Sequence, residues 1–548
     1  MKNLNLVRDP FMKVLDQEGG EQEISIKEAL INANQYKGLS GECLPQDKSI
    51  ERLLRAILHR ILQDYDVHGN YIPITSADQA RDRWAEVWET GRFPAHPIED
   101  YLKKYEECFN LIDGHSPFMQ VHEQEKEIKF VSSKGKVARG DGLNPRSISK
   151  LVGTVFASET RPRVWADRYY EDHETLSLEE GARWLIFINN FDDASFKKPP
   201  TDIHVPFCGQ MTGIYAEGAN LFETLMLNLP LCQADDKLWK LNHPYWEMDS
   251  FGRSDVVTAP PDNPSLLLTY PYRRMNLKIN EEGRVTGYEL TGHHSFPTEN
   301  YLIEPNGVLR KPDPDKGIKL GFRKLNTDIL WKNYGDIFLD DSSDKSYQPG
   351  IIQWIGQMVS DYEISVPALK LRSVTVNYKS MQCVISEMTD DSLIMNSSLL
   401  ANDSIDWRIA IATVVNSLKK SAYVTGIFFK NIYIAQGGDP KTEYPSKKGE
   451  EIFWNEIDVP FRDWLQGIKK ISQIKKEESQ IKDKVLDICL QIMRDKRSSS
   501  TLKTALGRIV KEKKGSKEID VEYSLQKACA QYYSSIQTIW GIKRNDNS

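Results

Sequence analysis

Residues 371–388 read LRSVTVNYKSMQCVISEM, and this stretch points to the fold class. Leu371–Tyr378 and Cys383–Met388 are rich in β-branched and apolar residues, and the four residues 379–382 separate them. Two such runs joined by a short connection are typical of a β-hairpin. The stretch therefore predicts two antiparallel strands.

The neighbouring chain carries more runs of this kind. Leu266–Tyr270, Arg273–Ile279 and Arg284–Leu290 read as short strands, and Gly283 marks a turn between the last two. Residues 250–400 are therefore expected to contain an antiparallel sheet.

Helices are predicted before this region. Ser49–Tyr65 carries apolar residues at spacings of three and four, which is typical of a helix with one apolar face. Ile24–Asn34 and Leu176–Asn190 each open with a capping box, a Ser followed three residues later by Glu. Further helices are expected over residues 78–90, 98–110 and 221–229, and a first strand within Leu4–Val14.

From about residue 403 the pattern becomes helical again. Apolar periodicity marks one helix over 407–423, a long one over 464–492 and a last one over 521–540, and a fourth lies around 450–466 or starts the long one. We expect an antiparallel bundle of about four helices. The predicted fold class is α+β, with a large mixed N-terminal domain containing an antiparallel sheet over residues 1–400 and a C-terminal four-helix bundle over residues 401–548.

The composition is that of a soluble globular protein. The 548 residues are 40% hydrophobic and 27% charged, and no apolar run approaches the ~18 residues of a membrane-spanning helix. The start shows no apolar segment typical of a secretory signal, so a cytoplasmic location is expected. The seven cysteines are widely spaced without a CxxC pair, so we expect reduced thiols and neither a disulfide framework nor a zinc site.

The charge is unevenly distributed along the chain. The net charge of −7 divides into −14 for residues 1–400 and +7 for residues 401–548. Such a division suggests separate domains with different partners, and a basic C-terminal domain fits local contact with phosphates. The alternative is a solvated helical bundle that is rich in lysine.

The usual enzyme motifs are absent from the sequence. It contains no GxxxxGK[ST], no GxGxxG after a predicted strand, no GxSxG and no HExxH. His293-His294 is a poor chelate, because successive side chains of a strand face opposite sides. The Asp pairs at 192–193 and 340–341 are of the type that two-metal nucleases use. A metal-dependent nuclease built from dispersed carboxylates therefore stays as an alternative function.

Several segments, taken in order along the chain, resemble one family: the large subunit (CasA) of the type I-E CRISPR surveillance complex, Cascade. The most specific are Pro117-Phe118-Met119-Gln120 and the Glu-Thr-Leu-Met-Leu-Asn-Leu run of residues 223–229. The others are Leu4–Phe11, Ile24–Leu30, Phe109–Asp113, Leu178–Leu185, Leu266–Lys278 and Leu330–Gly335.

The resemblance implies a non-enzymatic, DNA-binding subunit in antiviral defence, with no cofactor and no metal. In the family this subunit reads the protospacer-adjacent motif (PAM) in double-stranded DNA and promotes duplex opening, so that the guide RNA can pair. The implied partners are target DNA, the guide-RNA ribonucleoprotein with the other Cascade subunits, and a helicase–nuclease recruited in trans. A structural scaffold that binds only RNA and protein is the second alternative.

The resemblance also implies a wedge hairpin tipped by glutamine, which the family inserts beneath the PAM. Gln382 matches that glutamine, Met381 and Cys383 flank it, and Lys379 is placed to contact phosphate. An apolar and amide tip suits insertion, because it replaces a lost stacking face and bonds a base edge. The alternative is an ordinary exposed hairpin turn.

The family approaches the PAM with a glycine-rich loop, because glycine lets the backbone come close to DNA. The aligned stretch here holds Ser195, Phe196, Lys197 and Lys198 and no glycine. We expect Ser195 or a lysine to make the contact instead; the alternative is a solvated loop.

The family's lysine finger in the minor groove has no counterpart in this sequence. No lysine occurs between residues 279 and 310, and the aligned segment holds His293, His294 and Asn300. Either that contact is missing or another residue makes it.

Residues 131–150 have five Lys and Arg against one Asp, and three glycines. By position this is the family's mobile basic loop, which implies salt-sensitive contacts with guide RNA, a neighbouring subunit or duplex DNA. The residues concerned are Lys134, Lys136, Arg139, Arg146 and Lys150. The alternative is a disordered surface loop. In the C-terminal region, lysines between residues 469 and 484 are candidates for steering a DNA strand, or for plain solvation.

Overall fold

The computed structural model describes most of the chain. The described residues are 3–112, 117–121, 127–131, 137–141, 144–152, 156–158, 161–162, 175–194, 205–233, 235–248, 261–293, 304–325, 329–339, 346–379, 382, 384–469, 472–514 and 517–542.

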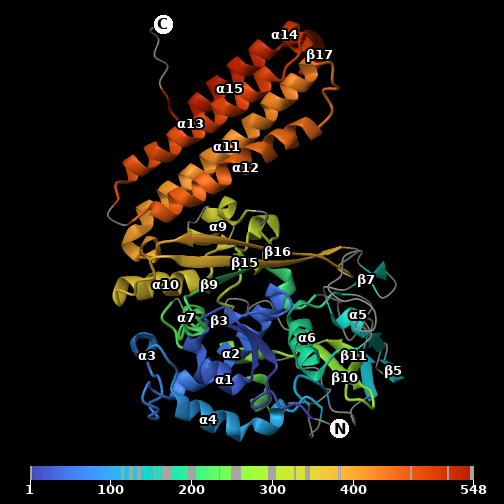
Figure 1. The fold of residues 1–548 in the computed structure, drawn as a ribbon, viewed down its shortest axis with the longest axis vertical. Coiled ribbons are helices and arrows are strands. Elements are labelled where there is room, and N and C mark those ends of the chain that lie inside the picture. Colours follow the sequence, from blue (N-terminus) through green and yellow to red (C-terminus); the bar gives the residue numbers. More distant parts are fainter. Residues whose placement is uncertain are drawn as a thin grey trace. The chain divides into compact units, whose positions relative to one another are not determined.

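The chain forms two compact units, whose elements Figure 1 labels. The first comprises Met1–Leu330, Asp336–Ile364 and Leu369–Ser392, and the second comprises Trp331–Gly335, Ser365–Ala368 and Leu393–Ser548. The continuous part of the second unit thus starts at Leu393, whereas the sequence analysis drew its boundary at residue 400. The first unit combines helices with small antiparallel sheets, so the predicted mixed class is confirmed.

The N-terminal sheet has the order β2-β1-β3, built from β1 (Met12–Asp16), β2 (Glu21–Ile24) and β3 (Tyr36–Leu39). Its first strand starts later than the predicted strand within Leu4–Val14. The Asn5 backbone N–H donates to Asp9 Oδ2 at 2.8 Å, and the Asp9 N–H donates back to the Asn5 carbonyl. This turn keeps the segment before Pro10 out of the sheet.

Both predicted capping boxes are confirmed. α1 (Ile26–Ile31) begins after Ser25 and α6 (Leu178–Phe191) begins after Ser177, and in each the Ser and the Glu at the third helical position bond each other's backbone N–H. These bonds satisfy donors that a helix start otherwise leaves unpaired. The capping box thus fixes where α6 begins, and α6 ends beside the candidate site.

Helix α2 (Leu44–Asp64) starts five residues before the predicted Ser49–Tyr65 helix, and its polar side is buried as well. Lys48, Arg52, Arg55 and His59 are only 2%, 0%, 0% and 1% exposed. Arg52 Nη1 pairs with Glu304 Oε2 at 2.8 Å, and Arg55 Nη1 donates to the Asn228 carbonyl at 2.8 Å. Burial lowers the pKa of His59 to about 3, so this imidazole is neutral. The polar face of α2 is therefore an internal scaffold of the first unit.

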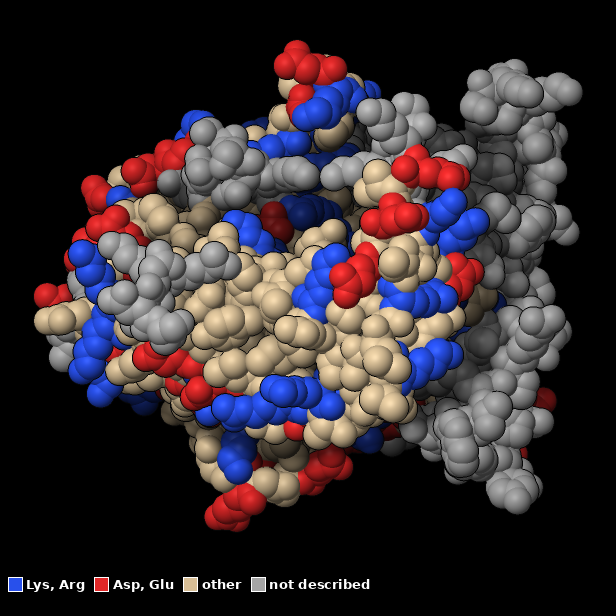
Figure 2. Space-filling model, turned by 90° about the horizontal axis from the view of Figure 1, so that it is seen from above, with Lys and Arg blue, Asp and Glu red and all other residues tan. Residues whose placement is uncertain are grey.

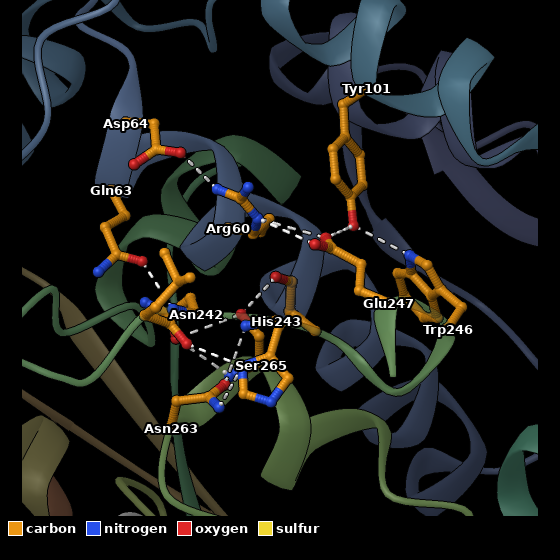
Figure 3. Close-up of polar contacts among 12 residues, drawn as sticks. Arg60, Gln63, Asp64, Tyr101, Asn242, His243, Trp246, Glu247, Asn263 and Ser265 are labelled. Carbon is orange, nitrogen blue, oxygen red and sulfur yellow. Dashed lines mark hydrogen bonds and ion pairs between the residues drawn. The ribbon is translucent and has the colours of Figure 1, made fainter. Parts of the chain in front are cut away.

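A polar network fixes residues 242–248 against α2 and α4 (Ala95–Lys104), as Figure 3 shows. Glu247 Oε1 contacts Arg60 Nε at 3.3 Å and accepts a hydrogen bond from the Tyr101 hydroxyl at 2.6 Å. Trp246 Nε1 donates to the same hydroxyl at 2.9 Å. These polar groups can be buried because they are hydrogen-bonded to one another.

Residues 264–269 form helix α8 (Pro264–Thr269), which corrects the predicted strand Leu266–Tyr270. The Asn263 side chain caps this helix by accepting from the Leu266 backbone N–H at 2.9 Å, and a proline stands at its first position. A short apolar run does not distinguish strand from helix by its periodicity, so the cap decides. Figure 3 draws Asn263 beside His243, to which it also bonds.

The remaining helices of the first unit connect its sheets. They are α3 (Ala77–Thr90), α5 (Ile148–Leu151), α7 (Leu221–Leu227) and α10 (Gly350–Asp361). α9 (Tyr334–Phe338) starts in the second unit and ends in the first.

The predicted strands Arg273–Ile279 and Arg284–Leu290 are confirmed as β10 (Arg273–Ile279) and β11 (Val285–His293), which pair antiparallel. β11 also pairs with β6 (Asn144–Ser147). A further three-stranded sheet has the order β13-β12-β14, built from β12 (Leu309–Arg310), β13 (Gly321–Phe322) and β14 (Ser346–Tyr347). Two smaller sheets have two strands each. One pairs β4 (Glu127–Val131) with β5 (Val137–Asp141), and the other pairs β7 (Phe156–Ser158) with β8 (Arg161–Pro162).

The predicted loop over residues 131–150 therefore contains regular structure in its described parts. The register pairs Lys129 with Arg139 across β4 and β5, and Tyr288 with Arg146 across β11 and β6. The sequence hid these strands because charged residues and glycine interrupt the apolar alternation that marks a strand.

The second unit contains four long helices in its described residues. They are α11 (Ile405–Ala435), α12 (Tyr444–Gly467), α13 (Ile474–Ser498) and α15 (Leu525–Ile539). The predicted long helix over 464–492 is two helices, because α12 ends at Gly467 and α13 begins at Ile474.

A short helix and a hairpin, α14 (Leu502–Leu506), β17 (Arg508–Lys514) and β18 (Lys517–Tyr523), precede α15. They correct the prediction of a last helix from residue 521, because β18 continues to Tyr523 and α15 begins at Leu525. Among the described residues, no helix is both long and apolar enough to cross a membrane.

Two glycines set the spacing of α11 and α12. A Cβ at Gly449 would lie 2.8 Å from the Thr425 carbonyl oxygen and 3.0 Å from Gly426 Cα, and one at Gly426 would lie 2.9 Å from the Ser446 carbonyl oxygen. The two backbones therefore approach too closely for any side chain at this crossing.

Candidate nucleic-acid interface

The predicted hairpin exists as β15 (Leu369–Lys379) and β16 (Val384–Met395), the pair of long strands in Figure 1. The Ser386 hydroxyl donates to the residue 377 carbonyl and the Thr389 hydroxyl to the residue 375 carbonyl, so the two strands run antiparallel. β15 pairs on its other edge with β9 (Gly213–Glu217). The hairpin is thus anchored in a three-stranded sheet and ends in the turn that holds Gln382.

Two of the four predicted wedge residues belong to the described chain. Lys379 and Gln382 are both exposed, and Met381 and Cys383 lie outside the described residues. Gln382 has φ +67°, a left-handed backbone that non-glycine residues rarely adopt. The turn therefore holds a strained backbone and presents the glutamine side chain to solvent.

Tyr378, just before the turn, fastens the hairpin to the end of α6. Its hydroxyl donates to the Phe191 carbonyl at 2.8 Å. A Cβ at Gly209 would lie only 2.3 Å from that hydroxyl, so a larger residue there would displace the Tyr378 side chain. Burial, with the nearby Asp192 carboxylate, raises the pKa of Tyr378 well above its ordinary value and keeps it a neutral donor.

The turn of the hairpin is bonded directly to the residue before the predicted PAM loop. The Ala194 backbone N–H donates to the Gln382 carbonyl at 2.7 Å. The loop residues Ser195, Phe196, Lys197 and Lys198 lie outside the described residues. The hydrogen bond nevertheless joins the two chain positions where the loop starts and where the hairpin turns, 188 residues apart in the sequence.

Both carboxylates of the Asp pair at 192–193 form ion pairs with cationic side chains. Asp192 Oδ2 pairs with Arg273 Nε, and Asp193 Oδ2 pairs with Lys150 Nζ at 2.8 Å. Arg273 Nη2 also donates to the Asp193 carbonyl at 3.0 Å. These contacts fix the chain directly before the predicted PAM loop, so the two carboxylates act here as anchors of the backbone.

Lys324 is a further cation beside the hairpin, which the sequence analysis missed. Its Nζ donates to the Val376 carbonyl of β15 and lies 4.7 Å from the centroid of the Tyr378 ring. Burial lowers the pKa of this lysine to about 8. Nothing in the local sequence marks Lys324, because its proximity to β15 arises only in the folded chain.

The basic segment is placed in part. Arg139 lies on β5 and Arg146 on β6, whereas Lys134 and Lys136 lie outside the described residues. Lys150, also considered for a nucleic-acid contact, is nearly buried in its ion pair with Asp193. The basic segment thus ends in a nearly buried ion pair that holds it to the chain at Asp193.

Exposed charges of the second unit are mixed in sign. On α13, Lys475, Lys476 and Lys484 are exposed, but Asp483 and Asp487 are exposed on the same helix. On the face that Figure 2 draws, Lys and Arg are likewise interspersed with Asp and Glu. Electrostatic attraction to DNA at such a surface depends on local clusters of lysine.

The chain was compared with known families and solved structures. It matches the model of the family described as CRISPR-associated protein Cse1 over residues 5–492. It is 26% identical over 320 residues to the CRISPR-associated protein CasA/Cse1 of Thermus thermophilus, an alignment that covers 56% of this chain and 57% of that relative. The match thus spans little more than half of the relative's length.

Solved structures share the fold. The crystal structure of Thermobifida fusca Cse1 superposes with a TM-score of 0.76 at 20% identity and covers 98% of both chains. A chain of a solved CRISPR RNA-guided surveillance complex gives a TM-score of 0.69 at 13% identity and covers 98% of this chain and 100% of that one.

Proposed function

The chain belongs to the CRISPR-associated Cse1 family, and from this premise we propose that it is the PAM-reading subunit of an RNA-guided surveillance complex. It recognises the PAM in double-stranded DNA, promotes duplex opening for guide-RNA pairing and recruits the helicase–nuclease. Protein contacts then read a short motif, and base pairing reads the rest. The chain itself performs no cleavage.

The hydrogen bond from the Ala194 N–H to the Gln382 carbonyl supports this proposal most directly. Reading a motif and opening the duplex beneath it require two elements at one place on the DNA. The bond joins the turn of the proposed wedge to Ala194, the residue directly before the proposed PAM loop. Ala194, the residue before loop 195–198, is thereby held at the turn that exposes the Gln382 side chain.

The neighbouring contacts make the arrangement stiff. Tyr378 holds β15 to the end of α6, and the pairs Asp192–Arg273 and Asp193–Lys150 hold the chain that leads to Ala194. Insertion between base pairs costs a few kcal/mol of stacking per step, so a wedge works only on a rigid support. The exposed Lys379 then contacts a phosphate beside the inserted turn.

The sequence analysis based the nuclease alternative on two Asp pairs. Of these, only the pair at 192–193 lies within the described residues, and its contacts do not favour a nuclease. Each carboxylate of Asp192 and Asp193 already balances a cation, and neither belongs to a group of three or more metal-ligating side chains within the described residues. The basic strands β5 and β6 and the exposed lysines of α13 are instead proposed to contact nucleic-acid backbones.

The test separates binding from opening. A reconstituted complex carrying Gln382→Ala is titrated with target duplex, and opening is followed by the fluorescence of 2-aminopurine placed beside the PAM. We expect about a tenfold or greater loss in opening rate and a smaller change in initial affinity. Gln22→Ala, an exposed glutamine of β2, is the matched control and should change neither. Unchanged opening with Gln382→Ala would contradict the wedge.

A further inference from the structure

We propose that a cavity of the first unit is a binding site for a nucleobase. The cavity has a volume of about 330 Å³, which is within the range of ligand sites in proteins. Residues 230–239, residues 304–309, β14 with the residue that follows it, and α10 line it. It is built from residues other than those of the proposed DNA interface, and the proposal does not rest on the proposed function.

Aromatic rings form much of the cavity wall. Trp239 and Trp354 are 9% and 3% exposed, and Tyr347 of β14 is the third aromatic residue of the lining. Pro230, Pro305 and Leu309 add apolar surface. Flat apolar walls of this kind bind planar rings by stacking, and every nucleobase offers such a face.

Trp354 also carries a polar group that lacks a partner. Its Nε1 has no hydrogen bond, although the residue is buried. The indoles of Trp84 and Trp239, in contrast, donate to the Met226 and Pro230 carbonyls at 3.0 and 3.1 Å. A buried unpaired N–H is costly and rare in folded proteins. Because an indole N–H only donates, a ligand in the cavity pairs with it only through an acceptor, and only when the indole turns to bring its buried Nε1 to the cavity surface.

Two glutamines of α10 supply groups of both kinds. Gln353 and Gln357 stand four residues apart, on the same face of the helix, and both line the cavity. Each amide both donates and accepts, as the edge of a nucleobase does, and glutamine pairs with adenine in this way in DNA complexes. Gln348 and Gln233 also line the cavity, but their amide groups donate to the Phe338 and Leu238 carbonyls.

The charges of the cavity favour a neutral ligand. Glu304 lines it, but its Oε2 pairs with Arg52 at 2.8 Å and its Oε1 accepts from the Asn306 N–H at 3.1 Å. Asp235 pairs with Lys237. The described lining residues include no Lys or Arg, and a further cation beside them is Lys311, whose Nζ lies 5.3 Å from the centroid of the Tyr347 ring. A base therefore fits inside the cavity, while its sugar and any phosphate stay outside.

The base belongs either to a free nucleoside or to an unpaired nucleotide of a strand, since both present the same ring and edge. Equilibrium dialysis of the full chain against labelled adenosine, guanosine, cytidine and thymidine measures the first source. Competition with single-stranded oligonucleotides, intact or carrying an abasic position, measures the second.

Gln353→Leu and Gln357→Leu keep the side-chain size and remove the hydrogen bonds. We expect saturable binding of at least one base at millimolar concentration or below, and a tenfold or greater weakening in the double variant. Gln537→Leu, the same change on the half-buried side of α15, should leave binding unchanged. Thermal unfolding of each variant shows whether it folds, and Trp354→Phe provides a second variant that removes the N–H while keeping a ring.

Displacement of the bound nucleoside by the intact oligonucleotide, but not by the abasic one, assigns the site to an unpaired strand. Absence of displacement assigns it to a free nucleoside, and both results support a nucleobase site. Binding of no base, or binding that the glutamine and Trp354 variants leave unchanged, would overturn the proposal.

Discussion

At the scale of single residues, Gln382 combines two properties that seldom occur together. Its backbone is left-handed, and its carbonyl accepts the Ala194 N–H. Glycine would adopt this backbone without strain, yet the position carries a long amide side chain. A strained residue at an exposed turn is consistent with selection for the side chain rather than for stability.

Replacing Gln382 by glycine separates these roles. A left-handed backbone costs a non-glycine residue about 1–2 kcal/mol, and the greater freedom of glycine in the unfolded chain offsets about 0.5–1 kcal/mol of the gain. We expect Gln382→Gly to raise the unfolding free energy of the first unit by up to about 1 kcal/mol, measured in urea, while duplex opening falls as it does for Gln382→Ala. A stabilised variant that opens DNA normally would assign the side chain no role.

Lys324 gives a prediction about pH. Burial lowers its pKa to about 8 in the folded chain, whereas an unfolded lysine titrates near pH 10.4. Between these values the unfolded chain binds more protons, so stability rises with pH. We expect the wild-type chain to gain stability relative to Lys324→Met as the pH increases from 8 to 10, measured by urea unfolding. Parallel curves for the two chains across this interval would show that Lys324 is not buried in solution.

At the scale of elements, the sequence predicted those helix starts and strands that depend on contacts between residues close together in the chain. The capping boxes at Ser25 and Ser177 placed the starts of α1 and α6, and the two apolar runs around residues 379–382 placed the hairpin. The sequence analysis did not predict the strands β4, β5, β17 and β18, because charged residues obscure their alternation of apolar and polar residues.

The candidate site was predictable only in its parts. The sequence pattern predicted the hairpin, and the family resemblance singled out Gln382 and the loop after Asp193 and assigned them roles. Their direct hydrogen bond, and the contact of Lys324 with Tyr378, depend on packing between segments far apart in the chain. No local pattern encodes such a contact, so the structure was needed to find it.

The crossing of α11 and α12 depends on Gly449. Because its Cβ would meet backbone atoms of α11, we expect Gly449→Ala to destabilise the second unit by about 1–3 kcal/mol, measured by thermal or urea unfolding. Gly467, at the end of α12, has nothing within 4 Å of its Cβ position, so Gly467→Ala is the matched control and should be close to neutral. Equal effects of the two changes would contradict the close approach of the helices.

At the scale of the whole molecule, the chain carries an acidic first part and a basic last part. Residues 1–400 have a net charge of −14 and residues 401–548 one of +7. An acidic protein binds DNA through local cationic groups rather than through its overall field. The basic stretch 131–150 is one such local exception in the acidic part of the chain.

Neutralising Lys134, Lys136 and Arg139 tests that stretch. Each phosphate contact that is lost lowers affinity for all DNA sequences alike and reduces the slope of log affinity against log salt by about one. We expect the triple change to glutamine to weaken binding of the complex to matched and mismatched duplexes equally, with a flatter salt dependence. Affinity that stays as salt-sensitive as that of the wild-type chain would remove these residues from the interface.

The central claim is that this chain confers PAM reading on the surveillance complex. The most direct measurement reconstitutes the guide-RNA complex with and without the chain and titrates both against target duplexes that carry a randomised PAM. We predict that high affinity and PAM preference both require the chain, so that the complex lacking it binds weakly and without preference. Equal affinity and equal PAM preference in the two complexes would contradict the claim.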